Sequence, residues 1–362
     1  MTELLIQKNQ EKKQIALVEN GKLIEYYEED NETNRREGNI YIGIVKDIIK
    51  GMQAAFVDIG TEKNSFIHLK DILPKIDETK ETQDENIKIS DIIKPNQKLL
   101  VQIKKDSNEK KGARVSTHIN LPSKYIVLMP NTEIITVSQK IESEEEQKRL
   151  VKLVKENLEQ GNGAIIRTSA QGKEKEIIED IKNIQNKWNK IIETGINPNQ
   201  NNPKLLYKSE DIIDKMLMDM TDKEISIKRG KDIFNTYGIN KQIEKIQNRK
   251  IWLKCGGFIT IDKTEALTAI DINSGKFTGK KNSSKENTIY KVNQEATVEI
   301  AKQLRLRNIS GIIVIDYIDM EEEQDRKNIM NLLDKELKKD RSKTQIMGFT
   351  KLDLLEMTRK KL

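Results

Sequence analysis

The chain has 362 residues, of which 36% are hydrophobic and 34% charged, and its net charge is +6. This length fits roughly two to four domains, and the modest positive charge permits a polyanionic partner without requiring one. No stretch approaches the ~18 consecutive apolar residues of a membrane span, and the N-terminal residues lack a signal-peptide core, so we expect a protein that works where it is made.

The counts of cysteine and histidine narrow the chemistry. A single cysteine, Cys255, excludes an intramolecular disulfide and a cysteine-cluster zinc site within one chain. The two histidines, His68 and His118, argue against a paired-histidine nuclease. Any hydrolytic chemistry would therefore depend on carboxylates and a bound metal.

Short apolar runs make up the first third of the chain. Residues 15–18 and 23–27 flank Asn20-Gly21, a strong signal for a β-hairpin, and a polar linker follows. Between residues 40 and 116, five runs punctuated by glycine and one polar loop (residues 76–95) predict a small closed barrel. The OB-fold is the commonest barrel of this kind that binds oligonucleotides.

Residues 124–200 change to the order strand, helix, strand, helix. An apolar run ending at Met129 precedes Ser143, where a capping box opens a helix. The second helix is predicted from four apolar residues at helical spacing, namely Ile177, Ile181, Ile184 and Trp188. After a linker at residues 196–204, strands and helices alternate to the C-terminus, which favours a mixed α/β sheet.

Two later apolar runs end in oxygen-bearing side chains. Residues 265–275 carry Asp271 and Asn273, which project to one face if the run is a strand. A second run ends at Asp316, and a predicted helix over residues 287–306 joins the two. This strand–helix–strand order makes the strands parallel and brings their carboxyl ends together, at the edge where open α/β sheets bind ligands.

Asp271, Asn273 and Asp316 therefore form a predicted all-oxygen site. Such a site suits Mg²⁺, which keeps several waters and binds phosphate oxygens, and which can activate water for attack on a phosphodiester. The simpler interpretation is that each aspartate is a strand-end cap or a solvated turn residue. Both aspartates interrupt runs that have the pattern of buried strands, which favours the site. Asp319 is out of phase with Asp316 and is not included.

Four long strings resemble the ribonuclease E/G family, and they occur in the family's order along nearly the whole chain. They are GMQAAFVDIG (51–60), EALTAIDINSG (265–275), QLRLRNISGIIVIDYIDM (303–320) and LLEMTRKKL (354–362). The resemblance implies an α/β multidomain fold. Its expected parts are an RNase H-like part in two segments (1–36 and 201–248), an OB-fold barrel (37–118), a 5′ sensor (119–200) and a deoxyribonuclease-I-like catalytic part (249–362).

The resemblance also implies an activity. Asp271 and Asp316 match the family's metal-binding carboxylates, and Asn273 matches its supporting amide. The implied reaction is Mg²⁺-dependent hydrolysis of single-stranded RNA to a 3′-hydroxyl and a 5′-phosphate, in messenger RNA turnover and ribosomal RNA maturation.

Three residues in the barrel match the family's RNA contacts: Phe56, Phe66 and Lys111. Exposed aromatic residues on an OB-fold stack on bases without regard to sequence. The alternative is that both phenylalanines belong to the core, where Phe is usually found, and that the lysine is a solvated loop charge.

The 5′ sensor has a matching set for the RNA's 5′-monophosphate: Arg167, Thr168 and the backbone of Val127. Arginine offers a bidentate fork to a phosphate. Two residues depart from the family pattern, because Ser123 replaces a pocket glycine and Gln139 replaces an arginine. These departures put a strict preference for 5′-monophosphate in doubt, but not cleavage.

The family's paired-cysteine zinc motif lies beyond the end of this sequence, so a zinc-linked tetramer is not expected, and a homo-oligomer would need ordinary packing. We expect a cytoplasmic protein, or a plastid stromal one if the chain is organelle-encoded. A non-catalytic RNA-binding module that uses the barrel and the sensor is the main alternative. A deoxyribonuclease fits the metal site equally well.

Overall fold

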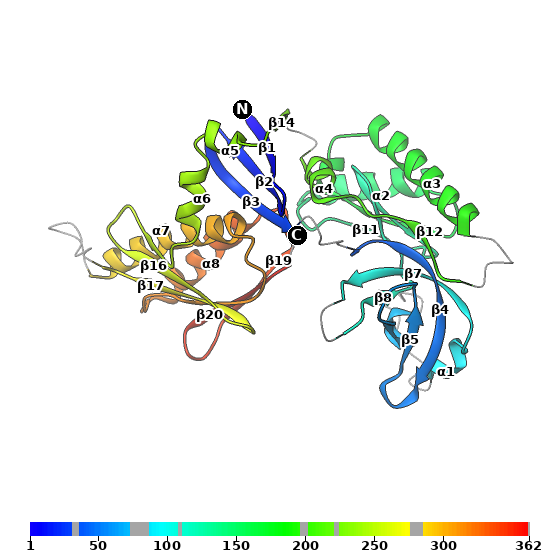
Figure 1. Cartoon of the computed structure of the whole chain (residues 1–362). Helices are drawn as coiled ribbons and strands as arrows, with labels where there is room; N and C mark the ends of the chain where they lie inside the picture. The colour runs from blue at the N-terminus through cyan, green and yellow to red at the C-terminus, as the bar shows by residue number, and fades with distance from the viewer. Residues whose placement is uncertain are drawn as a thin grey trace. The chain divides into compact units, whose positions relative to one another are not determined.

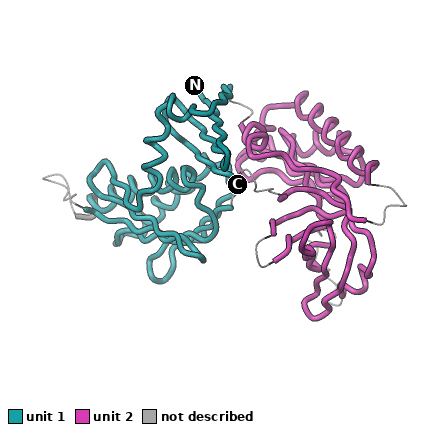
Figure 2. The backbone as a smooth tube through the Cα atoms, viewed as in Figure 1, with its two compact units in different colours: residues 1–33, 223–362 teal, residues 34–222 magenta. Residues whose placement is uncertain are grey.

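The chain divides into two units, which Figure 2 colours separately. Unit 1 combines residues 1–33 with residues 223–362, and unit 2 spans residues 34–222. The computed structural model describes residues 1–30, 36–72, 87–107, 111–195, 202–220, 224–275 and 285–360. Among the helices described in these ranges, none is long and apolar enough to cross a membrane.

A four-stranded sheet opens unit 1, with the order β14-β1-β2-β3. Its strands are β1 (Thr2–Lys8), β2 (Lys12–Glu19), β3 (Lys22–Asp30) and β14 (Ile225–Arg229). Asn20 and Gly21 join β2 to β3 with φ of 50° and 77°, the left-handed conformations that a tight hairpin requires. The predicted hairpin is therefore confirmed. Helices α5 (Ile233–Thr236) and α6 (Asn240–Ile246) pack on this sheet.

A six-stranded sheet, here called the C-terminal sheet, forms the rest of unit 1, with the order β15-β16-β17-β18-β20-β19. The strands are β15 (Lys250–Trp252), β16 (Phe258–Lys263), β17 (Leu267–Asn273), β18 (Gly311–Asp316), β19 (Thr344–Phe349) and β20 (Leu354–Arg359). β17 and β18 are parallel, and α7 (Lys285–Leu306) connects them. The predicted crossover is confirmed, and the antiparallel neighbours make the sheet mixed.

One face of the C-terminal sheet is covered by helices. Figure 1 shows α7 and α8 (Glu323–Leu337) against it, and their apolar stripes join the inward-facing isoleucines of β16, β17 and β18 in one core. The side chains that alternate with those isoleucines point to the opposite face, called the open face below. The open face carries Asp271 and Asp316, both of which are exposed.

The barrel of unit 2 consists of β4 (Ile40–Ile49), β5 (Ala54–Asp58), β6 (Ser65–His68), β7 (Lys98–Lys105) and β8 (Arg114–Ser116). Pairing of β4 with β7 closes it, as predicted. Within the predicted polar loop, residues 73–86 lie outside the described ranges. The later part instead forms a short helix, α1 (Ile89–Ile92), because Ile89 and Ile93 are buried in the barrel core.

The second part of unit 2 is the predicted α/β unit. Its sheet has the order β11-β12-β10-β9, formed by β9 (Leu121–Pro122), β10 (Ile126–Pro130), β11 (Ile135–Val137) and β12 (Asn162–Ile166). Helices α2 (Glu144–Asn157) and α3 (Lys175–Gly195) cover it. Ser143 accepts a hydrogen bond from the Glu146 backbone N–H, so it caps α2 as predicted. The four apolar residues predicted for the second helix are all buried.

The mixed α/β fold with an OB-like barrel is thus observed, whereas the RNase H-like and deoxyribonuclease-I-like layout stays a prediction. One strand differs from the expected arrangement. β13 (Lys204–Tyr207) falls in the segment 201–248 that we expected to complete the RNase H-like part, yet it pairs with barrel strand β4. β14, later in the same segment, does pair with β1.

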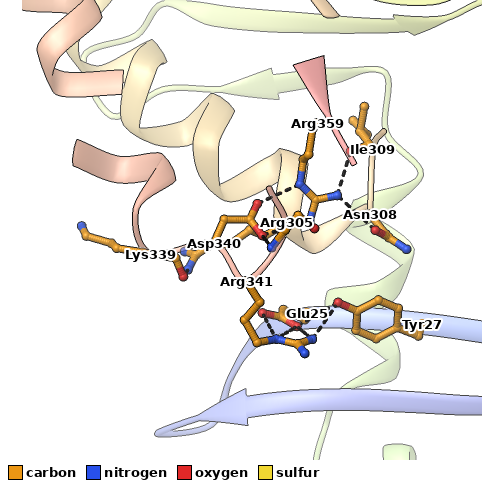
Figure 3. Close-up of polar contacts among 10 residues, drawn as sticks. Glu25, Tyr27, Arg305, Asn308, Ile309, Lys339, Asp340, Arg341 and Arg359 are labelled. Atoms are coloured by element: carbon orange, nitrogen blue, oxygen red, sulfur yellow. Dashed lines mark hydrogen bonds and ion pairs between the residues drawn. The ribbon is translucent and has the colours of Figure 1, made fainter. Parts of the chain in front are cut away.

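A buried ion-pair network, drawn in Figure 3, ties the two sheets of unit 1 together. Arg359 at the end of β20 donates from Nε to Asp340 at 2.8 Å, and the two side chains are 0% and 1% exposed. Arg341, which follows Asp340 in the sequence, donates to Glu25 of β3 at 2.5 Å and to the hydroxyl of Tyr27 at 3.0 Å. The turn after α8 therefore holds both β20 and β3.

We predict that Asp340→Asn destabilises the protein by about 3–5 kcal/mol, because it leaves the Arg359 guanidinium buried without its countercharge. The midpoint of urea unfolding measures the effect. Glu323→Gln removes one partner of an exposed pair on α8 and should leave the midpoint unchanged. Equal midpoints for the two variants would contradict the role given to the network.

Candidate active site

Asp271 and Asp316 are direct partners across the parallel strands β17 and β18. Neighbouring strands lie about 4.8 Å apart, so the two residues stand side by side. Asp316 ends β18, Asp271 lies two residues before the end of β17, and the other faces of the two strands are fixed in the core by Ile270 and Ile315. The sequence therefore placed the two carboxylates together correctly, at the carboxyl ends of adjacent strands.

The surroundings of these carboxylates differ from the expected ones in one respect. The apolar runs had the pattern of strands buried on both sides, yet Asp271 and Asp316 are exposed on the open face. Exposed Ile312, at the start of β18, shows why the pattern misled, because an apolar residue on that face need not be covered. Both carboxylates are thus accessible to a large substrate.

Asn273 lies on the same strand and the same face as Asp271. Its amide Nδ2 donates to Asp271 Oδ2 at 2.6 Å. The amide therefore orients the carboxylate. Close backbone packing fixes this end of β17. A Cβ on Gly257 would lie 2.8 Å from the Asn273 carbonyl oxygen. A Cβ on Gly275, where φ is +59°, would lie 2.6 Å from the Gly256 carbonyl oxygen.

Like charges surround Asp316. Its pKa is raised, first by desolvation and then by the negative charges of Asp271 and Asp319. Within the described part of the chain, no lysine or arginine lies near enough to lower the pKa of Asp316 again. Asp319 lies beyond the end of β18, where the two-residue period of a strand no longer determines which way a side chain points.

Two buried polar residues of α7 support the segment after β18, and the sequence reasoning did not identify them. Asn293 donates to the Ile318 carbonyl at 2.8 Å and accepts from its backbone N–H at 3.2 Å. The hydroxyl of Thr297 lies 3.0 Å from that of Tyr317. Their spacing of four residues beside the apolar stripe of α7 was the available signal.

The donor set suits a hard cation that needs few protein ligands. Among the described residues, no group of three or more His, Cys, Asp or Glu could hold a metal ion. Mg²⁺ is commonly bound through one or two carboxylates, with waters and substrate phosphates as its other ligands. The two adjacent carboxylates of Asp271 and Asp316 fit that pattern.

The barrel displays its two phenylalanines instead of burying them. Phe56 on β5 is paired with Phe66 on β6, the rings meet edge to face at 6.3 Å, and Phe56 is 36% exposed. Neither ring belongs to the barrel core. Lys111 is exposed. The next residue, Gly112, packs so closely on the Asn64 carbonyl that a Cβ there would lie 1.9 Å from its oxygen.

The 5′-sensor residues converge around the end of β12. Arg167 follows β12 directly, Thr168 opens a short 3₁₀ helix, and Val127 pairs with Ile165 on the adjacent strand β10. The Thr168 hydroxyl lies 3.0 Å from that of Ser138. The predicted phosphate ligands therefore lie together at one end of this sheet.

Arg167 already has hydrogen-bond partners within the protein. Its guanidinium pairs with Asp219 at the end of α4 (Ile212–Asp219) and donates to the Ser123 carbonyl at 2.7 Å. The Ser123 hydroxyl, at the position where the family pattern has glycine, donates to Asp180 of α3 at 2.5 Å. Gln139, the other departure, is exposed in a turn.

Comparison with known proteins identifies the family. The model of the Ribonuclease E/G family matches residues 120–227 and 224–362. The chain is 38% identical to Ribonuclease G of Salmonella typhimurium over 99% of its length and 80% of that protein. The chain belongs to the ribonuclease E/G family. Ribonuclease G of Haemophilus influenzae is 37% identical over 99% of the chain and 79% of its own length, and Ribonuclease E of a Nostoc species is 35% identical over 96% and 56%.

Membership makes the chain an endoribonuclease of the ribonuclease E/G type, acting in RNA processing, and it confirms the family expected from the four strings. The alternative of a non-catalytic RNA-binding module is not favoured by these comparisons. The roles of individual residues and of Mg²⁺ stay predictions, which the pairing of Asp271 with Asp316 supports.

We predict that Asp271→Asn lowers the pKa of Asp316 in the metal-free protein, because it removes the negative charge on the neighbouring strand. An NMR titration of the aspartate carboxyl carbons measures this pKa. Asp262→Asn is the matched control, since Asp262 lies on the same sheet but is paired with Arg249. An unchanged Asp316 titration in Asp271→Asn would refute the proposed proximity.

The same shift fixes the sign of the effect on stability. The pKa of Asp316 is higher in the folded chain than in the unfolded chain, so its ionisation opposes folding as the pH rises through the folded value. Asp316→Asn should therefore unfold at an equal or higher urea concentration at neutral pH. A loss of activity in that variant is then not a loss of fold.

Proposed function

We propose that this chain is a Mg²⁺-dependent endoribonuclease that hydrolyses single-stranded RNA, leaving a 3′-hydroxyl and a 5′-phosphate. The observation that supports this most directly is the pairing of Asp271 with Asp316 on the open face of the C-terminal sheet, with Asn273 hydrogen-bonded to Asp271. The proposed substrates are messenger RNA and ribosomal RNA precursors, as the family implies.

In this proposal, Asp271 and Asp316 hold the ion, and Asn273 keeps the Asp271 carboxylate oriented toward it. Bound Mg²⁺ would supply an activated water and offset charge that develops on the phosphodiester. Both carboxylates must be ionised to hold the ion. Because the pKa of Asp316 is raised, cleavage should fall on acidification at a higher pH than an ordinary aspartate would give.

The barrel would grip the RNA without reading its sequence. Base stacking on exposed aromatic residues contributes roughly 1–3 kcal/mol per base and tolerates every base. Phe56 and Phe66 present such a pair on one face of the barrel, and Lys111 adds a cation.

For the 5′ end of the RNA, we propose a sensor in which the RNA's 5′-monophosphate competes with the carboxylate of Asp219 for Arg167. Arg167 would bind a 5′-monophosphate only by giving up its pair with Asp219. Exchange of one anion for another gains less than pairing of an unengaged guanidinium. The proposed preference for 5′-monophosphorylated RNA is therefore a moderate one.

We predict that Asp271→Asn and Asp316→Asn each reduce cleavage of an A/U-rich single strand by about 10³-fold or more, because each removes a ligand from an ion that stabilises the transition state by several kcal/mol. Binding of the same RNA should be nearly unchanged. The rate of appearance of 5′-phosphorylated fragments with added Mg²⁺ is the measurement, and Asp262→Asn is the control. Normal cleavage by both variants would contradict the proposal. If single-stranded DNA inhibits RNA cleavage and is itself cut, the chain is a deoxyribonuclease.

We predict that Asp219→Asn strengthens the preference for 5′-monophosphorylated over 5′-hydroxyl RNA by about tenfold, since a charge-assisted hydrogen bond of ~1.5 kcal/mol no longer competes for Arg167. The ratio of kcat/KM for the two RNAs measures the preference. Arg167→Gln should reduce that ratio to near one. If the ratio is equal in Asp219→Asn and in the unchanged protein, the competition does not exist.

A further inference from the structure

An aromatic cluster on the open face of the C-terminal sheet has no part in the reaction proposed above. Trp252 of β15 and Phe258 of β16 meet edge to face, with ring centroids 5.3 Å apart. The ammonium of Lys250 lies 4.2 Å from the Trp252 ring centroid and 3.5 Å from that of Phe258. These three residues are called the Trp252 platform below.

The strand register places the Trp252 platform in line with Asn273, on the face that carries the two carboxylates. Trp252 is paired with Phe258, and Phe258 is paired with Asn273. Residues directly opposite one another share a face, so the two rings and the amide form one row across β15, β16 and β17. Two strand spacings separate Trp252 from Asn273, about 10 Å between backbones.

The turn between β15 and β16 fixes that placement. On either side of Trp252, Ile251 packs against the core and Leu253 is buried within it. Leu253 donates to the Gly257 carbonyl at 2.8 Å, and Gly257 in turn packs on the backbone of Asn273. Trp252 is therefore held rigidly relative to the end of β17.

The exposure of Trp252 is the informative feature. Its side chain is 59% exposed, although Lys250 and Phe258 both lie against it. A lone exposed apolar residue would need no explanation. Two aromatic rings with a cation, in the same row as Asn273, form instead the combination that binds single-stranded nucleic acid, in which rings stack on bases and cations attract the backbone.

We infer that the Trp252 platform is a base-stacking subsite for single-stranded RNA. A base next to the phosphodiester bound at Asp271 and Asp316 stacks on Trp252, and Lys250 contacts a flanking phosphate. This inference rests on the proposed function for the position of the RNA. It adds a subsite in unit 1 that is separate from the phenylalanines of the barrel.

Tryptophan fluorescence tests the stacking directly. The chain has two tryptophans, and Trp188 is buried in unit 2 at 6% exposure. Oligoadenylate RNA, added with a chelator to prevent cleavage, should quench the emission saturably. Quenching should persist in Trp188→Phe and disappear in Trp252→Phe, whereas an abasic ribose-phosphate strand of the same length should not quench.

The affinities of the unchanged protein and its variants for RNA give the contribution of stacking to binding. Trp252→Ala should weaken binding of oligoadenylate about 5- to 150-fold and leave binding of the abasic strand unchanged, while Trp252→Phe should bind nearly normally. Met347→Ala, an exposed apolar residue of β19 in the same sheet, is the matched control and should bind normally. Lys250→Gln should reduce the salt dependence by about one phosphate contact.

Normal binding of oligoadenylate by Trp252→Ala, or quenching that survives in Trp252→Phe, overturns the subsite. The subsite is also overturned if the unchanged protein is an oligomer, the Trp252→Ala variant is a monomer, and the two bind RNA equally well. The face would then be a contact between copies of the chain. These results do not depend on cleavage. The subsite can therefore fail while Asp271→Asn and Asp316→Asn still abolish cleavage, and it can hold while the proposed mechanism fails.

Discussion

The site depends on one constraint, the register between two parallel strands. β17 and β18 pair so that Asp271 and Asp316 are opposite one another on the open face, which lies opposite the core formed with α7 and α8. Two carboxylates at this separation repel, and the pKa of Asp316 is raised first by desolvation and then by the negative charges of Asp271 and Asp319. The fold tolerates it because the opposite faces of both strands are fixed in an apolar core, so the strands cannot separate to relieve it. A divalent cation is the natural counterpart of such a pair.

The rest of unit 1 maintains that register. α7 covers the strands and supports the segment after β18 through Asn293, so the helix both buries apolar surface and positions backbone near the site. At the opposite end of β18 from Asp316, Arg359 fixes the neighbouring strand β20 to the turn after α8. Arg341 of that turn is paired with Glu25 of the N-terminal sheet. Rigid support of this kind is what a site needs if its ligands are to keep a productive geometry.

Much of this could be predicted from the sequence, and the exceptions have physical causes. Hairpin chemistry at Asn20-Gly21, the cap at Ser143 and the helical spacing of Trp188 are local signals, and each gave the observed element. The crossover rule placed Asp271 beside Asp316. The exposure of both strands on one face was missed, because an apolar residue such as Ile312 looks the same whether it is covered or not. The pairing of β13 with the barrel and of Asp219 with Arg167 are contacts between distant segments that no local pattern encodes.

Whether the two adjacent carboxylates share one divalent ion can be measured by anomalous diffraction from crystals of the full chain grown with Mn²⁺ in place of Mg²⁺. We expect one strong anomalous peak between Asp271 and Asp316, with a carboxylate oxygen of each residue at about 2.0–2.3 Å, and we expect the peak to be lost in Asp271→Asn. A peak bound elsewhere in unit 1, with none between these two side chains, would contradict this expectation.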